Sequence, residues 1–228
     1  KAGLDDLVHR TESFEVREPQ SGQYEVMMKA SVKGRNSKAG FHLHTNLTIL
    51  GNGEFILAQK VEPMGELPDR LPKIGLQAVL NKEFEHMRWY GRGPGETYPD
   101  RKNSARVGLY SQTVDEMEES YLVPGDYGNR SDVRWVAITN DQGTGWLVSA
   151  DSLLNFSAHP YSTDHLDRAR YRHQLQSADA IYFHVDHRVS GLGTKFHEPL
   201  ERHQVHTRPH SWVIRFKPLS KGGLPGQP

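Results

Sequence analysis

The 228-residue sequence contains no cysteine. Disulfide frameworks, zinc sites built on thiolates and catalytic thiols are therefore excluded. The sequence also lacks an excess of either charge, because 28 lysines and arginines balance 28 aspartates and glutamates. The chain therefore lacks the excess of basic residues that is typical of nucleic-acid-binding proteins, and we expect no nucleic-acid partner.

Long apolar runs are missing as well. No window approaches ~18 consecutive apolar residues and no charged-then-apolar leader opens the chain, so we expect no membrane partner and no signal sequence. The expected location is the cytoplasm. The chain begins with Lys1 instead of methionine, which fits a piece of a longer polypeptide and fits a processed protein equally well.

Short segments of alternating apolar and polar residues are what the sequence has in quantity. Period-two alternation predicts strands at 41–50, 54–61, 75–81, 83–91, 133–139, 145–150, 181–189 and 211–217. In the last of these, Trp212, Ile214 and Phe216 are expected to face inward. Many short strands separated by turn residues predict an all-β fold of two packed antiparallel sheets.

Helical periodicity is scarce. Thr113 with Glu116 predicts a capping box, and Ser162 or Thr163 predicts the cap of a short helix that reaches Arg170. The length fits one domain, which we place at residues 1–217. Residues 218–228 contain three glycines and three prolines, and this composition predicts a disordered tail.

The stretch "WYGRGPGETYPDRK" at residues 89–102 cannot be a helix or a central strand. Its glycines permit positive φ and its prolines fix φ, which predicts a loop of defined shape after a strand. We expect five residues to form a structural signature loop: Arg92, Glu96, Tyr98, Asp100 and Arg101. Its arginines are expected to pair with the carboxylates close in sequence, or the charges pair across a contact with another domain.

Four motifs in this chain resemble one family. "GPGETYPDR" at 93–101 resembles the Gly-Pro-x-Glu-x-Tyr-Pro-Asp-Arg signature of the C-terminal domain of the long β-galactosidases of glycoside hydrolase family 2. Three further stretches are similar to later parts of that domain: "YLVPGDYGNRSDVRW" at 121–135, "NFSAHPYSTDHLDRARYRHQL" at 155–175 and "VDHRVSGLGTKFHEP" at 185–199. For residues 1–80 the resemblance extends only to strand-rich character.

The resemblance implies a galactose-mutarotase-like antiparallel super-sandwich whose first strands lie upstream of Lys1, so that this chain is an N-terminally truncated domain. It implies a parent enzyme that hydrolyses terminal β-D-galactose residues, as in lactose, with two glutamates on a TIM barrel of ~250 residues. This chain has no such barrel, so we expect no catalytic residue in it and no activity from it alone. A sheet without its edge partners is also expected to be marginally stable or prone to aggregation.

The same resemblance implies the partners and the metals. The chain would work with a barrel-bearing remainder, either in the same polypeptide or as a separate large subunit, in a homo-oligomer that binds a β-galactoside sugar. The Mg²⁺ and Na⁺ ions of the family belong to the barrel side, so no cofactor is expected here. The sequence has 13 histidines, of which His203, His206 and His210 follow no strand or helix register with a set of carboxylates beside them. Surface histidines or histidines with satisfied hydrogen bonds are the default interpretation, and no metal site is expected.

The loop after Gly191 and Gly193 is implied to reach the sugar and to offer an aromatic side chain, commonly tryptophan. This sequence has no tryptophan there, and His197 or Phe196 would take the substrate-binding role. In the alternative interpretation Phe196 packs under the loop and His197 is merely exposed.

Other functions stay open at this point. Glu96 and Asp100 could form a glycosidase carboxylate pair, although pairing with arginine would keep both ionised and unfit for acid catalysis. A free-standing aldose epimerase would use His184 or His187 with Glu198 or Glu201, and a carbohydrate-binding module is a further alternative.

Overall fold

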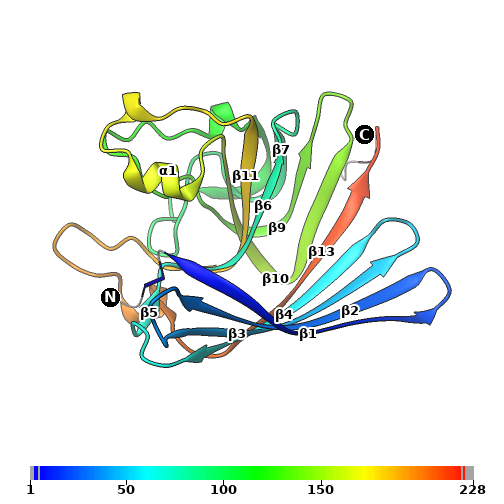
Figure 1. Cartoon of the computed structure of the whole chain (residues 1–228). Helices are drawn as coiled ribbons and strands as arrows, with labels where there is room; N and C mark the ends of the chain where they lie inside the picture. The colour runs from blue at the N-terminus through cyan, green and yellow to red at the C-terminus, as the bar shows by residue number, and fades with distance from the viewer. Residues whose placement is uncertain (1–2, 5, 222, 224–228) are drawn as a thin grey trace. The chain divides into compact units, whose positions relative to one another are not determined.

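The computed structural model describes residues 3–4, 6–221 and 223, and nearly all of its regular structure is antiparallel strand (Figure 1). The chain forms two compact units. Unit 1 consists of Lys1–Leu71 and Val205–Lys217, and unit 2 of Pro72–Gln204 and Pro218–Pro228. The predicted antiparallel all-β class is confirmed.

Unit 1 is built on five strands, each antiparallel to its neighbour, in the order β1-β2-β3-β4-β13. Glycines with positive φ, Gly22 at +78° and Gly53 at +83°, make two of the turns. A short pair, β5 (Arg70–Leu71) with β12 (Val205–His206), lies outside this sheet. The five strands are β1 (Leu7–Gln20), β2 (Gln23–Gly34), β3 (Gly40–Leu50), β4 (Phe55–Met64) and β13 (His210–Leu219).

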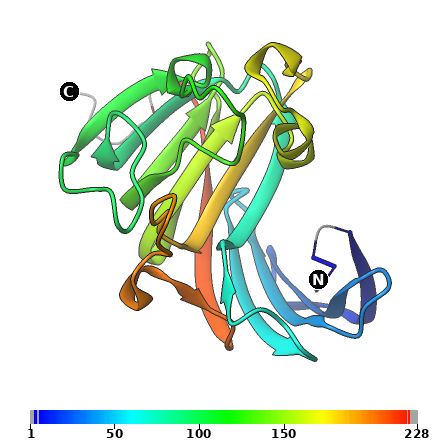
Figure 2. The ribbon, with the colours of Figure 1, turned by 90° about the vertical axis from the view of Figure 1, so that its left-hand side faces the viewer.

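Unit 2 carries six antiparallel strands in the order β8-β7-β9-β10-β11-β6 (Figure 2). The strands are β6 (Lys73–Asn81), β7 (His86–Gly93), β8 (Arg106–Thr113), β9 (Arg130–Thr139), β10 (Gly145–His159) and β11 (Ala180–Val189). The connections hold the short helices η1 (Asp115–Met117), α1 (Thr163–Arg168), η2 (Arg172–Gln174) and η3 (Glu201–His203). None of the helices in the described part of the chain is long and apolar enough to cross a membrane.

The core of unit 2 centres on Trp89 in β7, which is fully buried. Its ring lies 5.5 Å from Phe156 in an edge-on contact and 5.5 Å from Tyr110. The guanidinium of the buried Arg130 lies 5.9 Å from the Trp89 ring centre. Because β7 leads directly into residues 93–101, this packing fixes the base of the signature loop.

The predicted helix signals are confirmed in their main features. Thr113 donates its backbone N–H to the Glu116 carboxylate at 2.8 Å, and the Glu116 N–H returns a bond to the Thr113 hydroxyl at 3.3 Å, around η1. Ser162, not Thr163, caps α1 by accepting the His165 N–H at 3.1 Å. This helix ends at Arg168, two residues before the predicted end.

Every predicted strand segment overlaps an observed strand, but β1, β2, β5, β8 and β12 were not predicted. Trp212 and Ile214 are buried as expected, while Phe216 is half-buried and stacks on Phe55 at 4.5 Å. Pro218 and Leu219, which the sequence assigned to a disordered tail, belong to β13. Most of that predicted tail, residues 222 and 224–228, lies outside the described residues.

Candidate functional site

Two motif loops that lie far apart in sequence meet in unit 2. One is the signature loop, residues 93–101, and the other is the 191–199 loop. The Asp100 carboxylate accepts the backbone N–H of Gly193 at 2.7 Å and that of Leu192 at 3.1 Å. Arg101 donates from Nη2 to the Gly193 carbonyl at 2.6 Å. Three hydrogen bonds therefore join positions up to 93 residues apart.

Two glycines make this contact possible. Gly193 has φ of +64°, and a Cβ at this position would lie 2.4 Å from the His197 carbonyl oxygen. A Cβ on Gly191 would lie 2.6 Å from the Asp100 carboxyl carbon. The Gly191 N–H donates to the His203 carbonyl at 2.7 Å, which holds the base of the loop. The Gly-Leu-Gly sequence is thus needed for the loop to approach the carboxylate.

The outer part of the 191–199 loop closes on itself. The Thr194 N–H donates to the His197 carbonyl at 2.7 Å, and the Thr194 hydroxyl accepts the N–H groups of Phe196 at 3.3 Å and His197 at 3.0 Å. This turn leaves Phe196 82% exposed, with the Lys195 ammonium 5.8 Å from the ring centre. His197 is also exposed. The interpretation that Phe196 packs under the loop is therefore wrong.

Glu96 joins the signature loop to the segment before β9. Its carboxylate accepts the Gly128 N–H at 2.9 Å and hydrogen bonds from the hydroxyls of Tyr98 and Tyr121. The bond to Glu96 is the main reason that the pKa of Tyr121 rises to about 12. Burial, reinforced by the Glu96 charge, raises the pKa of Tyr98 well above its ordinary value. Both tyrosines therefore stay protonated and act as donors.

Hydrogen bonds from the buried residues Asn129 and Arg130 hold the same loop. The Thr97 N–H donates to the Asn129 carbonyl, and the Asn129 amide donates to the Thr97 carbonyl, both at 2.7 Å. Arg130 donates to the carbonyl oxygens of Pro94 at 3.1 Å and Gly128 at 2.8 Å. Burial lowers the pKa of Arg130, while the nearby Glu119 and Glu96 charges favour its protonated form. A buried cation thus anchors the first half of the loop.

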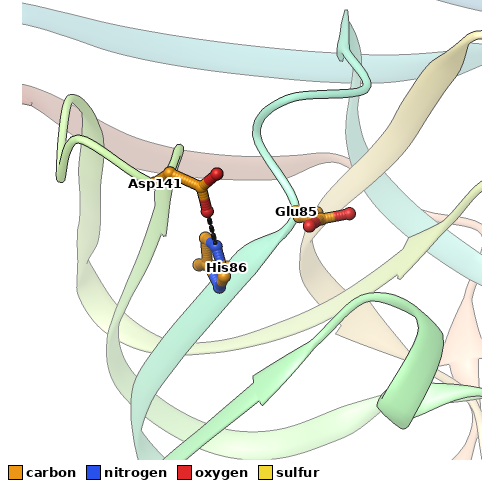
Figure 3. Close-up of side chains that lie close together, drawn as sticks. All are labelled: Glu85, His86 and Asp141. Carbon is orange, nitrogen blue, oxygen red and sulfur yellow. Dashed lines mark hydrogen bonds and ion pairs between the residues drawn. The ribbon is translucent and has the colours of Figure 1, made fainter.

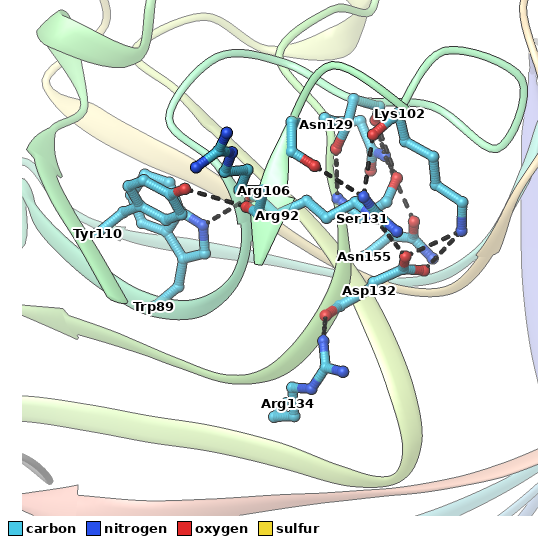
Figure 4. Close-up of polar contacts among 12 residues, drawn as sticks. Trp89, Arg92, Lys102, Arg106, Tyr110, Asn129, Ser131, Asp132, Arg134 and Asn155 are labelled. Atoms are coloured by element: carbon cyan, nitrogen blue, oxygen red, sulfur yellow. Dashed lines mark hydrogen bonds and ion pairs between the residues drawn. The ribbon is translucent and has the colours of Figure 1, made fainter. Parts of the chain in front are cut away.

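An ion-pair centre flanks the loop (Figure 4). Arg92 Nε lies 2.6 Å from an Asp132 carboxylate oxygen, and Lys102 Nζ lies 2.8 Å from the other oxygen. Arg92 also donates to the carbonyl oxygens of Ala105 at 2.7 Å and Lys102 at 3.0 Å. Burial alone would raise the pKa of Asp132, but the hydrogen bonds from Arg92 and Lys102 outweigh it and lower the pKa.

The structure corrects the expected partners of the signature carboxylates. Arg92 pairs with Asp132, and Arg101 binds a carbonyl, so the expectation that nearby arginines pair with Glu96 and Asp100 is wrong. The carboxylates instead accept backbone N–H groups of loops, which need an acceptor away from regular strands. Asp132, Arg130 and Asn129 were missed as individual residues, although all three lie in the quoted motif at 121–135.

A polar cluster that includes the buried His184 and Asp186 lies elsewhere in unit 2. Lys73 Nζ is 2.8 Å from Asp126, 3.3 Å from His184 Nδ1 and 3.9 Å from Asp186. Burial lowers the pKa of His184 well below its ordinary value, and Lys73 adds to this effect. Burial raises the pKa of Asp186 to about 7. His184 is therefore neutral at pH 7 and accepts from Lys73, which does not suit the acid role that an epimerase would require.

Comparison with known proteins identifies the family of this chain. The family model described as "Beta galactosidase small chain" matches residues 1–216. The chain belongs to the β-galactosidase small-chain family. A β-galactosidase of Priestia megaterium is 33% identical over 180 residues, which are 77% of this chain and 17% of that protein. A β-galactosidase of Pseudoalteromonas haloplanktis is 36% identical over 147 residues, 64% of this chain and 13% of that protein.

This small-chain match confirms the resemblance read from the four motifs. The chain spans less than a fifth of the length of the two β-galactosidases it matches. Among solved structures, a GalM/aldose epimerase homologue from C. elegans aligns over 92% of this chain and 69% of that chain, with a TM-score of 0.44 and 8% sequence identity.

One cluster in this small-chain domain has the composition of a metal site. Glu85, His86 and Asp141 bring potential ligand atoms within 4.8 Å of one another (Figure 3). His86 Nε2 lies 2.7 Å from an Asp141 oxygen, and both acids are exposed. The group offers three protein ligands, fewer than the four of a structural zinc site. Asp141 is 55 positions from His86, so sequence spacing gave no signal for it.

Proposed function

We propose that this chain is the non-catalytic part of a β-galactosidase and that it completes the sugar site with its 191–199 loop. The observation that carries the proposal is the small-chain family match over residues 1–216. The relatives named β-galactosidase extend far beyond the segment that matches. The catalytic carboxylates would lie in such a remainder, on the barrel that the motif resemblance implies, in the same polypeptide or in a separate subunit.

Phe196 and His197 are the proposed sugar contacts. The apolar C–H face of a pyranose packs favourably against an aromatic ring, whose face carries partial negative charge. Phe196 offers such a ring, because 82% of the side chain is exposed. His197 is exposed beside it and supplies ring nitrogens that can hydrogen-bond a hydroxyl group.

Glu96 and Asp100 do not suit the chemistry. A retaining glycosidase needs one carboxylate that is free to attack and a second that carries a transferable proton. Both oxygens of Glu96 accept hydrogen bonds, and each Asp100 oxygen accepts a backbone N–H. All four carboxylate oxygens are thus engaged by structural donors of the surrounding loops, so both residues act structurally. The Mg²⁺ and Na⁺ ions that the resemblance implies would likewise belong to the remainder.

The test is hydrolysis of a chromogenic β-galactoside by this chain alone and after mixing with the remainder of its enzyme. We expect no activity from the chain, none from the remainder alone, and activity from the mixture. Phe196→Ala and His197→Ala should then raise KM in the mixture. Hydrolysis by the chain alone that disappears in Glu96→Gln would instead place the chemistry in the signature loop and refute the proposal.

A further inference from the structure

The hydrogen bonds between the two motif loops involve only backbone atoms of the 191–199 loop. The Asp100 carboxylate accepts the backbone N–H groups of Leu192 and Gly193, and the Arg101 side chain donates to the backbone carbonyl of Gly193. No side chain of the 191–199 loop takes part in them. These hydrogen bonds therefore depend on the backbone conformation of the loop and not on the identity of its side chains.

The rest of the loop is held in the same way. The Gly191 N–H binds the His203 carbonyl at 2.7 Å, and the Gln204 amide donates to the Pro199 carbonyl at 2.6 Å. In the outer turn, the Thr194 hydroxyl adds a side chain to the backbone contacts. The side chains of Phe196 and His197 point into solvent and make no hydrogen bond with other described residues. They can therefore change without removing a contact that fixes the loop.

We propose that Asp100 and Arg101 are positioning residues that form a clamp indifferent to loop sequence, and that the clamp carries an exchangeable sugar-contacting tip at Phe196 and His197. This inference rests on the proposed function. Two charged groups hold three backbone atoms at the base, so the tip is presented in one orientation. Specificity for the sugar or for the accepting molecule can then change through the tip residues alone.

The first experiment tests the clamp in this chain, without sugar. Hydrogen exchange of the Leu192 and Gly193 amides is measured in the unaltered chain, in Asp100→Ala and in Asp100→Asn. We expect exchange at both amides to rise at least about tenfold in Asp100→Ala, because a charge-assisted acceptor is lost. The milder Asp100→Asn should give a smaller rise, and Asp167→Asn, an exposed acid on α1, is the control and should give none.

Tip variants complete this experiment. Phe196→Trp should leave exchange of the Leu192 and Gly193 amides unchanged, because the clamp does not contact that side chain. Unchanged exchange in both Asp100 variants would overturn the clamp. A rise in Phe196→Trp equal to that in Asp100→Ala would overturn its independence from loop sequence.

The second experiment uses the complete enzyme and a chromogenic β-galactoside. Asp100→Ala should raise KM about tenfold and change kcat much less, and Phe196→Trp should change KM while amide exchange stays constant. A general loss of folding would lower the active fraction without altering KM. Faster exchange with an unchanged KM would refute the positioning role, whereas absence of activity in every reconstituted mixture would refute the proposed function and leave the exchange result standing.

Discussion

Asp132 shows how one residue can stabilise an entire loop. It has φ of 53°, a left-handed conformation that aspartate and asparagine tolerate better than most residues. Its carboxylate binds Arg92 and Lys102, and Arg92 in turn binds the carbonyl oxygens of Lys102 and Ala105. The two cations are therefore held on either side of the signature loop by one acid.

Replacing Asp132 with asparagine should lower the free energy of unfolding. Asparagine tolerates the left-handed backbone conformation at this position as aspartate does, so the change tests the carboxylate charge. We expect a loss of about 1.5–3 kcal/mol at pH 7, the usual range for hydrogen bonds to charged groups. The pKa of Asp132 is lower in the folded protein than the ordinary value of 3.8. Its stabilising contribution is thus fully present above pH 3.8 and is lost as the pH falls through the lower folded pKa.

Urea unfolding at pH 7 and near pH 3 measures this effect. The stability difference between the unaltered chain and Asp132→Asn should shrink at the lower pH, and the exposed Asp167→Asn should show no difference at either pH. A difference that is absent at pH 7, or that is undiminished in acid, would contradict the role of the charge.

At this scale the sequence identified important residues but not their partners. Glu96, Asp100, Arg92 and Arg101 were named as parts of a structural loop, yet the expected pairs were chosen by closeness along the chain. The actual partners lie up to 32 positions away for Glu96 and up to 93 for Asp100. Backbone acceptors and donors of a distant loop carry no sequence signal, so such partners cannot be read from residue types.

Strands were predictable where one face is buried. The segments at 133–139 and 181–189 became the well-buried β9 and β11, but β1 exposes every side chain and offered no apolar face to detect. β10 was predicted to end at 150, although it continues to His159. Its pairing with β9 is irregular between Ser149 and Leu154, which interrupts the alternation on which the prediction depended.

The pairing of β6 with β11 leads to a prediction at this scale. Gly75 lies opposite Asp186, and a Cβ at Gly75 would lie 2.4 Å from the Asp186 Cα and 2.5 Å from the Val185 carbonyl oxygen. Both are backbone atoms, so the strands must move apart. Gly75→Ala should therefore destabilise the chain by about 1–3 kcal/mol, the typical cost of overpacking.

Thermal and urea unfolding of Gly75→Ala give the measurement, with Gly95→Ala as the matched control. A Cβ at Gly95 meets no atom within 4 Å, and that variant should unfold like the unaltered chain. Equal stability of the two variants would mean that the strand pair can widen freely, contrary to its close packing.

At the scale of the whole molecule, the sequence did not predict that the last part of the chain returns to unit 1. The sequence predicted one domain over 1–217, whereas Val205–Lys217 rejoins unit 1 after the chain has formed most of unit 2. There β13 pairs with β4, and His210 lies opposite Val61. Alternation within each strand reveals its faces but not a partner about 150 positions away, because long-range pairing depends on the complete topology.

The exposure of β1 leads to the last prediction. Among the described residues β1 pairs only with β2, and its other edge is unpaired along a strand of 14 residues. Phe14 is 63% exposed and Val16 53% exposed on this strand. A long edge with exposed apolar side chains is a template for pairing with another chain. We therefore expect this chain, studied alone, to self-associate as its concentration rises.

Sedimentation velocity over a concentration series measures the association. Lysines on an edge strand oppose pairing, so Phe14→Lys with Val16→Lys should abolish or strongly reduce it. Leu122→Lys with Val123→Lys is the control, because these side chains are 89% and 67% exposed but lie outside any strand. If the control pair reduces association as much as the β1 pair, general apolar exposure and not the strand edge drives it. If neither pair changes it, β1 is not the associating surface.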